Sequence, residues 1–179
     1  LPEVLRIVSS LGLETEIGDV GKKLSLRRGL AVVTFGLQLQ FYFIGETEAE
    51  ADRLARRLVQ RVLPEPYFGG ALTGRELRLR GAHPDFADLL LWPKPPYHFK
   101  RDDKEYRARG QHDTLDPTSR QVFLGFWGDG IRPGIRVGRG AQLIDLAPTL
   151  AYLLGVAPPQ DARGRVLREA LAGPAQPNL

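Results

Sequence analysis

Two continuous apolar runs place the strongest limits on how this chain can fold. The first run covers Phe86–Trp92 and includes three consecutive leucines, and the second covers Val122–Trp127. Uninterrupted apolar strands are typical of parallel sheets whose two faces are both covered by helices. The sequence therefore predicts an α/β fold in which both runs are buried strands. A further short strand is expected at Ile135–Val137, after a turn at residues 129–134 that contains two glycines and a proline.

A period of two marks a different kind of strand nearer the start of the chain. Within Leu30–Ile44, apolar side chains alternate with polar or amphipathic ones, and the apolar positions are Leu37, Leu39, Phe41 and Phe43. This alternation predicts one long, half-buried strand in an antiparallel sheet, with Gly36 as a bulge or bend within it. Leu24 and Leu26 indicate a short strand before it.

Two helices have clear stop signals. Apolar residues at helical spacing predict a helix over Pro2–Leu11, and Gly12 follows as a C-terminal stop. A second apolar helix is expected over Asp145–Leu154, with Asp145 as its N-cap and Gly155 just past its end.

Two further helices have a start signal. Thr47 precedes Glu50 by three residues, and Thr73 precedes Glu76 by the same distance, which is the spacing of a capping box. The helix after Thr47 carries arginines interleaved with acids, a pattern that favours a solvated surface. Although the net charge is +4, no nucleic-acid motif accompanies it, so no specific nucleic-acid binding is predicted.

Length and composition limit the class of protein. The chain has 179 residues, enough for one domain or for one domain with a small annex. It has no cysteine, which excludes disulfides, thiolate metal sites and a cysteine nucleophile. No apolar run approaches the roughly 20 residues that a membrane-spanning helix needs, so no membrane span is predicted. The chain opens on Leu1 and has no methionine, and we expect its natural beginning to lie elsewhere.

The residues that can carry chemistry are few. His112 stands in a short loop ahead of the Val122–Trp127 run, a common place for functional groups in α/β enzymes. His83 precedes a proline and is interpreted as structural, and His98 with Asp102 and Asp103 only imitates a metal cluster. Three hydroxyls lie near His112 in sequence, but no nucleophile-elbow motif supports a local Ser-His-Asp arrangement; they belong to Thr114, Thr118 and Ser119. The neighbouring Asp116-Pro117 pair is interpreted as the start of a turn.

Several segments, taken in order, carry a resemblance to a known family. They are His83-Pro84, Asp88-Leu89-Leu90-Leu91, Gly110-Gln111-His112, Val122-Phe123-Leu124, the turn Gly128 to Gly134, Ile144-Asp145-Leu146-Ala147-Pro148-Thr149-Leu150 and Gly164-Arg165-Val166-Leu167. Together they resemble the C-terminal signature of the type I phosphodiesterase and nucleotide pyrophosphatase branch of the alkaline phosphatase superfamily. The resemblance covers 83–171 closely and the earlier residues loosely.

The resemblance implies a metal-dependent hydrolase of phosphoric esters. Members of that family use two divalent metal ions, usually zinc, and a serine or threonine nucleophile that forms a covalent phospho-enzyme. His112 matches a metal-ligating histidine, and Asp113 is placed to orient its imidazole through the other ring nitrogen. The family often has glycine where Asp113 stands, and a proline where Asp129 stands. The expected substrate is a small phosphate ester.

The remaining parts of such a site are not found in these residues. The nucleophile and the other metal ligands of the family precede the segment that this chain matches, so no catalytic residue is assigned here. A catalytic metal usually takes three protein ligands, and the chain by itself is therefore expected to bind no metal and to be inactive.

The predicted organisation has four parts. Residues 1–16 form a helix leading from an N-terminal core outside this sequence, and 17–80 form a small strand–strand–helix annex. Residues 81–172 are the C-terminal part of an alkaline-phosphatase-like core, an α/β sheet with flanking helices, and 173–179 are a flexible tail.

Two other interpretations stay open at this point. In the first, the chain belongs to a sulfatase, phosphonate hydrolase or phosphomutase relative, because these enzymes share the metal scaffold. Alternatively, it is a non-catalytic binding or interaction domain that keeps the superfamily's core. The sequence determines neither the oligomeric state nor the compartment.

Overall fold

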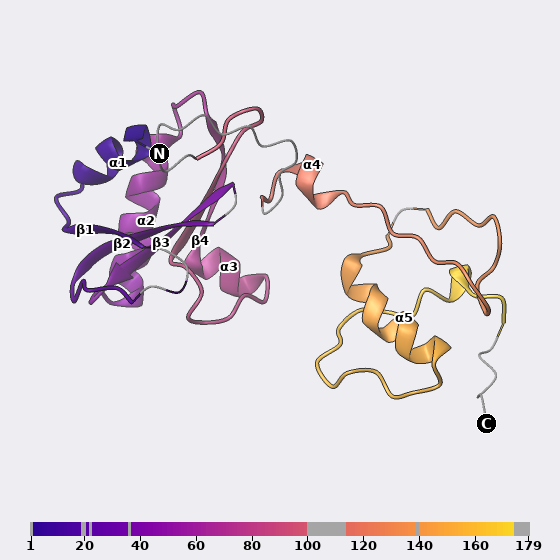
Figure 1. Ribbon diagram of the computed structural model, residues 1–179. Helices are drawn as coiled ribbons and strands as arrows, with labels where there is room; N and C mark the ends of the chain where they lie inside the picture. Colours follow the sequence, from indigo (N-terminus) through magenta and orange to yellow (C-terminus); the bar gives the residue numbers. More distant parts are fainter. Residues whose placement is uncertain are drawn as a thin grey trace. The chain divides into compact units, whose positions relative to one another are not determined.

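The computed structural model describes residues 2–18, 21, 23–35, 37–99, 114–138 and 140–173. The chain divides into two compact units, Leu1–Gln121 and Val122–Leu179. Figure 1 shows the strands and the longest helix, α2 (Glu48–Val62), in the first unit, and the helix α5 (Leu146–Leu153) in the second. In the described residues, no helix is long and apolar enough to cross a membrane.

The first unit is built on a five-stranded mixed sheet with the strand order β1-β2-β3-β5-β4. The strands are β1 Thr15–Gly18, β2 Gly29–Phe35, β3 Gln38–Ile44, β4 Phe68–Thr73 and β5 Leu89–Pro93. With its flanking helices, the sheet confirms the mixed α/β class. Only β1 and β2 pair in parallel, and every other pairing is antiparallel. The prediction of a parallel sheet around Phe86–Trp92 was therefore wrong, because β5 runs antiparallel to both of its neighbours.

The alternating segment Leu30–Ile44 is a hairpin rather than one strand. β2 and β3 pair antiparallel, with Leu30 opposite Phe43 and Phe35 opposite Gln38. The period of two holds in β3, where buried and half-buried positions alternate. Gly36, which we expected to bend a single strand, lies outside the described residues.

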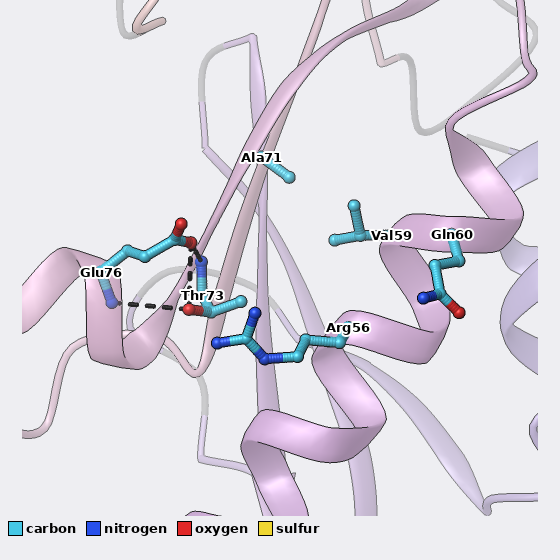
Figure 2. A pocket seen from close by; sticks show the side chains of 6 residues that line it. All are labelled: Arg56, Val59, Gln60, Ala71, Thr73 and Glu76. Atoms are coloured by element: carbon cyan, nitrogen blue, oxygen red, sulfur yellow. Dashed lines mark hydrogen bonds between the residues drawn. The ribbon is translucent and has the colours of Figure 1, made fainter.

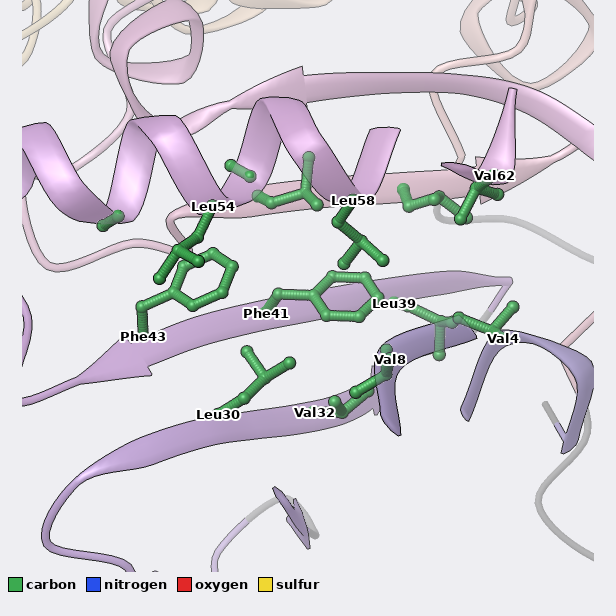
Figure 3. Packing of buried hydrophobic residues seen from close by; sticks show 14 of the residues in the cluster. Val4, Val8, Leu30, Val32, Leu39, Phe41, Phe43, Leu54, Leu58 and Val62 are labelled. Carbon is green, nitrogen blue, oxygen red and sulfur yellow. The ribbon is translucent and has the colours of Figure 1, made fainter. Parts of the chain in front are cut away.

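Two helices cover one face of this sheet. They are α1, Pro2–Ser9, and α2, Glu48–Val62, and both confirm their sequence predictions. Thr47 caps α2, since its hydroxyl accepts a hydrogen bond from the Glu50 N–H at 3.3 Å. Figure 3 shows the apolar stripe of α2 above the inward side chains of β2 and β3, with α1 beside them. The buried side chains include Val4, Val8, Leu30, Val32, Leu39, Phe41, Phe43, Leu54, Leu58 and Val62.

A third helix, α3 Gly74–Leu79, follows β4 and has the predicted capping box. The Glu76 carboxylate accepts from the Thr73 N–H at 2.8 Å, and the Thr73 hydroxyl accepts from the Glu76 N–H at 3.4 Å. Two orphan N–H groups at the helix start are satisfied in this way, as the three-residue spacing predicted.

The second unit contains little regular structure. Its helix is α5, Leu146–Leu153, flanked by the short 3-10 helices η1, Leu143–Asp145, and η2, Arg168–Ala170. The prediction of a buried strand at Val122–Trp127 was wrong, since this segment forms neither helix nor strand. The predicted strand at Ile135–Val137 is also absent from the described fold.

The division between units does not follow the predicted boundary between residues 80 and 81. That boundary separates β4 from β5, which pair side by side in one sheet, with Ala71 opposite Leu91. The segment 17–80 therefore shares its hydrogen-bonded sheet with β5, and the structural division comes after Gln121. In the predicted tail, 173–179, only Gly173 is described.

Candidate functional site

The two residues predicted to form the metal site lie outside the described residues. Neither His112 nor Asp113 is placed, and the description resumes at Thr114. The assignment of His112 as a metal ligand, and of Asp113 as the group that orients it, stays a prediction. In the remainder of the chain that is described, no three histidines, aspartates or glutamates gather closely enough to hold a metal ion.

The segment directly after the predicted ligand is a tight local turn. Asp116 caps the short helix α4, Pro117–Arg120, and its carboxylate accepts from the N–H and the hydroxyl of Thr118 at 2.9 and 2.7 Å. These hydrogen bonds, the hydroxyl's first, lower the pKa of Asp116. Thr114 is buried, and its hydroxyl accepts from the Asp116 N–H at 3.0 Å. The turn interpretation of Asp116-Pro117 is confirmed.

The other two histidines occupy exposed positions in the first unit. The imidazole Nδ1 of His83 accepts a hydrogen bond from the Asp85 N–H at 3.2 Å, which fits the structural role predicted for it. His98 lies in the loop after β5, and the two aspartates with which we compared it, Asp102 and Asp103, are outside the described residues.

A carboxylate in the second unit joins two segments of the resemblance. Asp145 is buried, and its oxygens accept from the N–H of Gln142 at 2.8 Å and from the N–H of Arg165 at 2.9 Å. These two backbone hydrogen bonds, the one from Arg165 first, lower the pKa of Asp145. The sequence predicted Asp145 as the N-cap of the helix, and it occupies that position. Its side chain, however, accepts from the N–H of Gln142, the residue before η1, and from the N–H of Arg165, and it does not cap α5.

Thr149 adds a second connection between the same two segments. Its side chain is fully buried, and the hydroxyl donates to the Asp145 carbonyl at 2.6 Å and accepts from the Leu167 N–H at 3.0 Å. Sequence reasoning missed this role, although a polar residue inside the most apolar helix of the chain was a visible signal. We call Asp145, Thr149 and their partners at 164–167 the α5 clasp.

The close approach of the two segments also explains a glycine. A side chain at Gly164 would collide with the backbone of Ile144, so the clasp can close only with glycine there. Arg165 then pairs with Glu169 through two hydrogen bonds of 3.0 and 2.6 Å, which lower the pKa of Glu169 to about 2. The α5 clasp holds two backbone segments together, and the side-chain oxygens of Asp145 and Thr149 all have hydrogen-bond partners within the protein.

The first unit contains a titratable group that is half-buried. The Asp88 carboxylate accepts from the Phe43 N–H at 2.7 Å, at the start of β5. Burial raises the pKa of Asp88, whereas the Phe43 hydrogen bond and the charge of Arg78 act in the opposite direction. Burial raises the pKa of the neighbouring Tyr42, and the negative charge of Asp88 raises it further.

A small pocket of about 260 Å³ lies between α2 and the β4–α3 junction. Figure 2 shows Arg56, Val59 and Gln60 on the helix facing Ala71, Thr73 and Glu76. Its polar groups are already engaged: Glu76 and Thr73 in the capping box, and Arg56 with Asp52 at 2.8 Å. This pocket therefore offers little unsatisfied chemistry.

The second unit contains a larger cavity of about 660 Å³. It is lined mostly by apolar side chains, among them Val122, Leu124, Phe126, Ile135 and Leu167, together with the arginines Arg132 and Arg136. Among the described pockets, this one combines an apolar wall with cations and with a segment of unpaired backbone.

Comparison with protein families, with curated proteins and with solved structures finds no match to this chain.

Proposed function

We propose that this chain is the C-terminal part of a metal-dependent phosphoric ester hydrolase similar to type I phosphodiesterases and nucleotide pyrophosphatases. The observation that carries the proposal is the order of the resembling segments from His83 to Leu167. In this proposal, His112 binds one of two divalent metal ions, and the remaining ligands and the nucleophile come from polypeptide outside the chain. The metal ions would supply charge neutralisation and an activated nucleophile.

The α5 clasp supports this interpretation at one point. The segments Ile144–Leu150 and Gly164–Leu167 belong to the same resemblance, and they are joined through Asp145 and Thr149. The residue types in these two segments are therefore explained by the contacts that hold the segments together. This is expected where a sequence signature reflects a shared fold and not a shared reaction. This support concerns the fold, and chemistry depends on His112.

The described residues do not complete a metal site, and this limits what the chain does alone. With no cluster of three donors among them, one histidine is left to bind the ion. Catalytic zinc sites commonly have three protein ligands, so we expect the isolated chain to retain no zinc.

The decisive experiment replaces His112 with alanine in the protein expressed from its complete reading frame. We expect bound zinc and the hydrolysis of bis(p-nitrophenyl) phosphate to fall together, by about 100-fold or more, because even the supporting residues of metal ligands are worth 10- to 100-fold. His83→Ala is the matched control, since His83 is exposed and its interactions are with the neighbouring Asp85. Unchanged zinc content and turnover in the His112 variant would contradict the proposal.

The rival function is a non-catalytic interaction domain, and one observation favours it. Val122–Trp127 exposes large apolar side chains, with Phe123 94% and Trp127 88% accessible. Exposed apolar surface of this kind often marks a contact with another polypeptide. A complete reading frame without a serine or threonine nucleophile and an Asp-His metal motif would favour this rival. A zinc-loaded preparation of the complete protein that hydrolyses no phosphate ester would favour it as well.

A sulfatase, phosphonate hydrolase or phosphomutase relative remains a variant of the first proposal. These enzymes share the metal scaffold, so the His112 variant would lose metal in each case. Relative rates on sulfate, phosphonate and phosphate esters by the same preparation separate them.

A further inference from the structure

The segment Val122–Trp127 has an unused backbone. Within the described residues, no N–H or C=O group of this segment takes part in a backbone hydrogen bond. The preceding residue, Gln121, has extended dihedral angles of φ −92° and ψ 102°. A side chain on Gly125 would lie only 2.8 Å from the Phe123 ring, so positions 123 and 125 face the same side, as in a strand. The segment thus resembles a strand without a neighbour.

The same segment forms one wall of the 660 Å³ cavity. Residues 122–126 contribute to its lining, and the rest comes from positions between Ile131 and Ala141 and from Leu167 and Ala170. Side chains that alternate along a bound strand would reach this apolar space at every second residue. The cavity can therefore select apolar side chains, while the backbone of 122–126 supplies the hydrogen bonds.

Two cations give the cavity a charge preference. Arg132 and Arg136 both line it, and among the described residues neither pairs with a carboxylate. Two carboxylates of the unit are engaged elsewhere, Asp145 by backbone N–H groups and Glu169 by Arg165. A partner that carries a negative charge would neutralise the two arginines, because guanidinium groups bind carboxylates in a bidentate manner.

We propose that Val122–Trp127 binds an extended segment of another protein by β-strand addition. The partner segment carries apolar side chains at every second position and a carboxylate at one end. Its backbone pairs with that of 122–126, its apolar side chains enter the cavity, and its carboxylate meets Arg132 and Arg136. This mode of recognition takes its affinity from main-chain hydrogen bonds and its specificity from the pockets for alternate side chains.

The test uses the whole chain and a synthetic peptide, acetyl-Val-Thr-Val-Thr-Val-Glu-Glu. We expect saturable binding by calorimetry, protection of the 122–126 amides from hydrogen exchange, and a shift in tryptophan fluorescence from Trp127. A peptide ending in two lysines instead of two glutamates should bind at least ten-fold more weakly, and added salt should weaken the acidic peptide. No binding at millimolar peptide, or equal binding of both peptides, overturns the proposal.

Three variants separate the contributions. Leu124→Pro removes a backbone N–H that has no partner in the described fold, and it should abolish binding while leaving the exchange protection of α5 unchanged. The double variant Arg132→Glu, Arg136→Glu should reverse the preference between the two peptides. Arg163→Glu is the control for charge reversal itself, because Arg163 is exposed and does not line the cavity.

Sedimentation of the chain without peptide tests whether a second copy of the chain occupies the site. A concentration-dependent dimer that Leu124→Pro dissociates would show that it does, and would overturn the proposal of an acidic partner segment. The binding experiment needs no metal and no turnover, so its outcome is independent of whether the hydrolase proposal holds.

Discussion

The two continuous apolar runs have the same sequence pattern and opposite environments. In β5, Leu89 and Leu91 are fully buried, and hydrogen-bonded strands lie on both sides. In the second unit, Phe123 and Trp127 are almost fully accessible, and their segment has no neighbouring strand in the described fold. A run of apolar residues indicates that a segment is suited to burial. Whether the segment is buried depends on other strands and helices that pack beside it.

The difference comes from what surrounds each run. β5 is inserted between β3 and β4, and α1 and α2 cover the face to which Leu89 and Leu91 point. The second unit has one α-helix, two short 3-10 helices and no strand among its described residues, so none of its described segments pairs with Val122–Trp127.

The largest effect should come from a charge placed in each run. Leu91→Asp puts an unpaired carboxylate at a position with 0% exposure, so the first unit should lose about 4 kcal/mol or more of unfolding free energy. Phe123→Asp, at an exposed position, should change stability by no more than about 0.5 kcal/mol. Urea denaturation followed by circular dichroism measures both. Equal losses would mean that the second run is buried as well.

A smaller effect is expected from the α5 clasp. Thr149→Val keeps the shape of the side chain but removes the hydroxyl, so the Leu167 N–H loses its acceptor in a buried place. The second unit should become less stable by about 1–3 kcal/mol, seen as faster amide exchange in α5. Thr15→Val on the exposed strand β1 is the control, because water can replace its hydrogen bond to the Leu13 carbonyl. No change in exchange at α5 would contradict the clasp.

The smallest effect is a difference in pH response between the units. The pKa of Asp88 is raised in the folded state, so its ionisation opposes folding, and its contribution to the stability of the first unit should decline as the pH rises from below 3.8 through the raised pKa. The pKa of Asp145 is lowered, so the second unit should gain stability above 3.8 and lose it as the pH falls through the lowered pKa.

Asparagine variants separate these two responses. Asp88→Asn keeps an acceptor for the Phe43 N–H and should remove the decline in the first unit. Asp145→Asn should reduce the acid sensitivity of the second unit, with a loss of stability at neutral pH, while the part that comes from Glu169 remains. Amide exchange measured between pH 3 and 7 follows each unit separately. If Asp88→Asn and Asp145→Asn changed the pH dependence of their units in the same direction, the opposite shifts would be contradicted.

Local features of the fold were predictable from the sequence because they depend on residues close together in the chain. Thr73 and Glu76 form the complete capping box that their spacing predicted. Thr47 accepts from the Glu50 N–H, whereas the Glu50 side chain pairs with Arg53 instead of completing a box. Gly12 and Gly155 follow their helices with φ of 72° and 66°, a conformation that glycine adopts without strain. The candidate site was predictable only as a set of residues, and its metal-binding part, His112 with Asp113, stays a prediction.

Long-range features were missed for a common reason. The split of Leu30–Ile44 into a hairpin, the antiparallel direction of β5 and the exposure of Val122–Trp127 all depend on which segments meet in space. The hydroxyl of Thr149 likewise has a role only once residues 145 and 167 lie beside it.

The sequence by itself therefore determined where helices begin and end, which residues are suited to burial, and which side chains can carry chemistry. Tertiary structure alone decided which strands pair, in which direction, and which apolar run stays open to a partner. The physical reason is that caps and turns are satisfied by neighbours within one helical turn, whereas sheet pairing joins groups tens of residues apart.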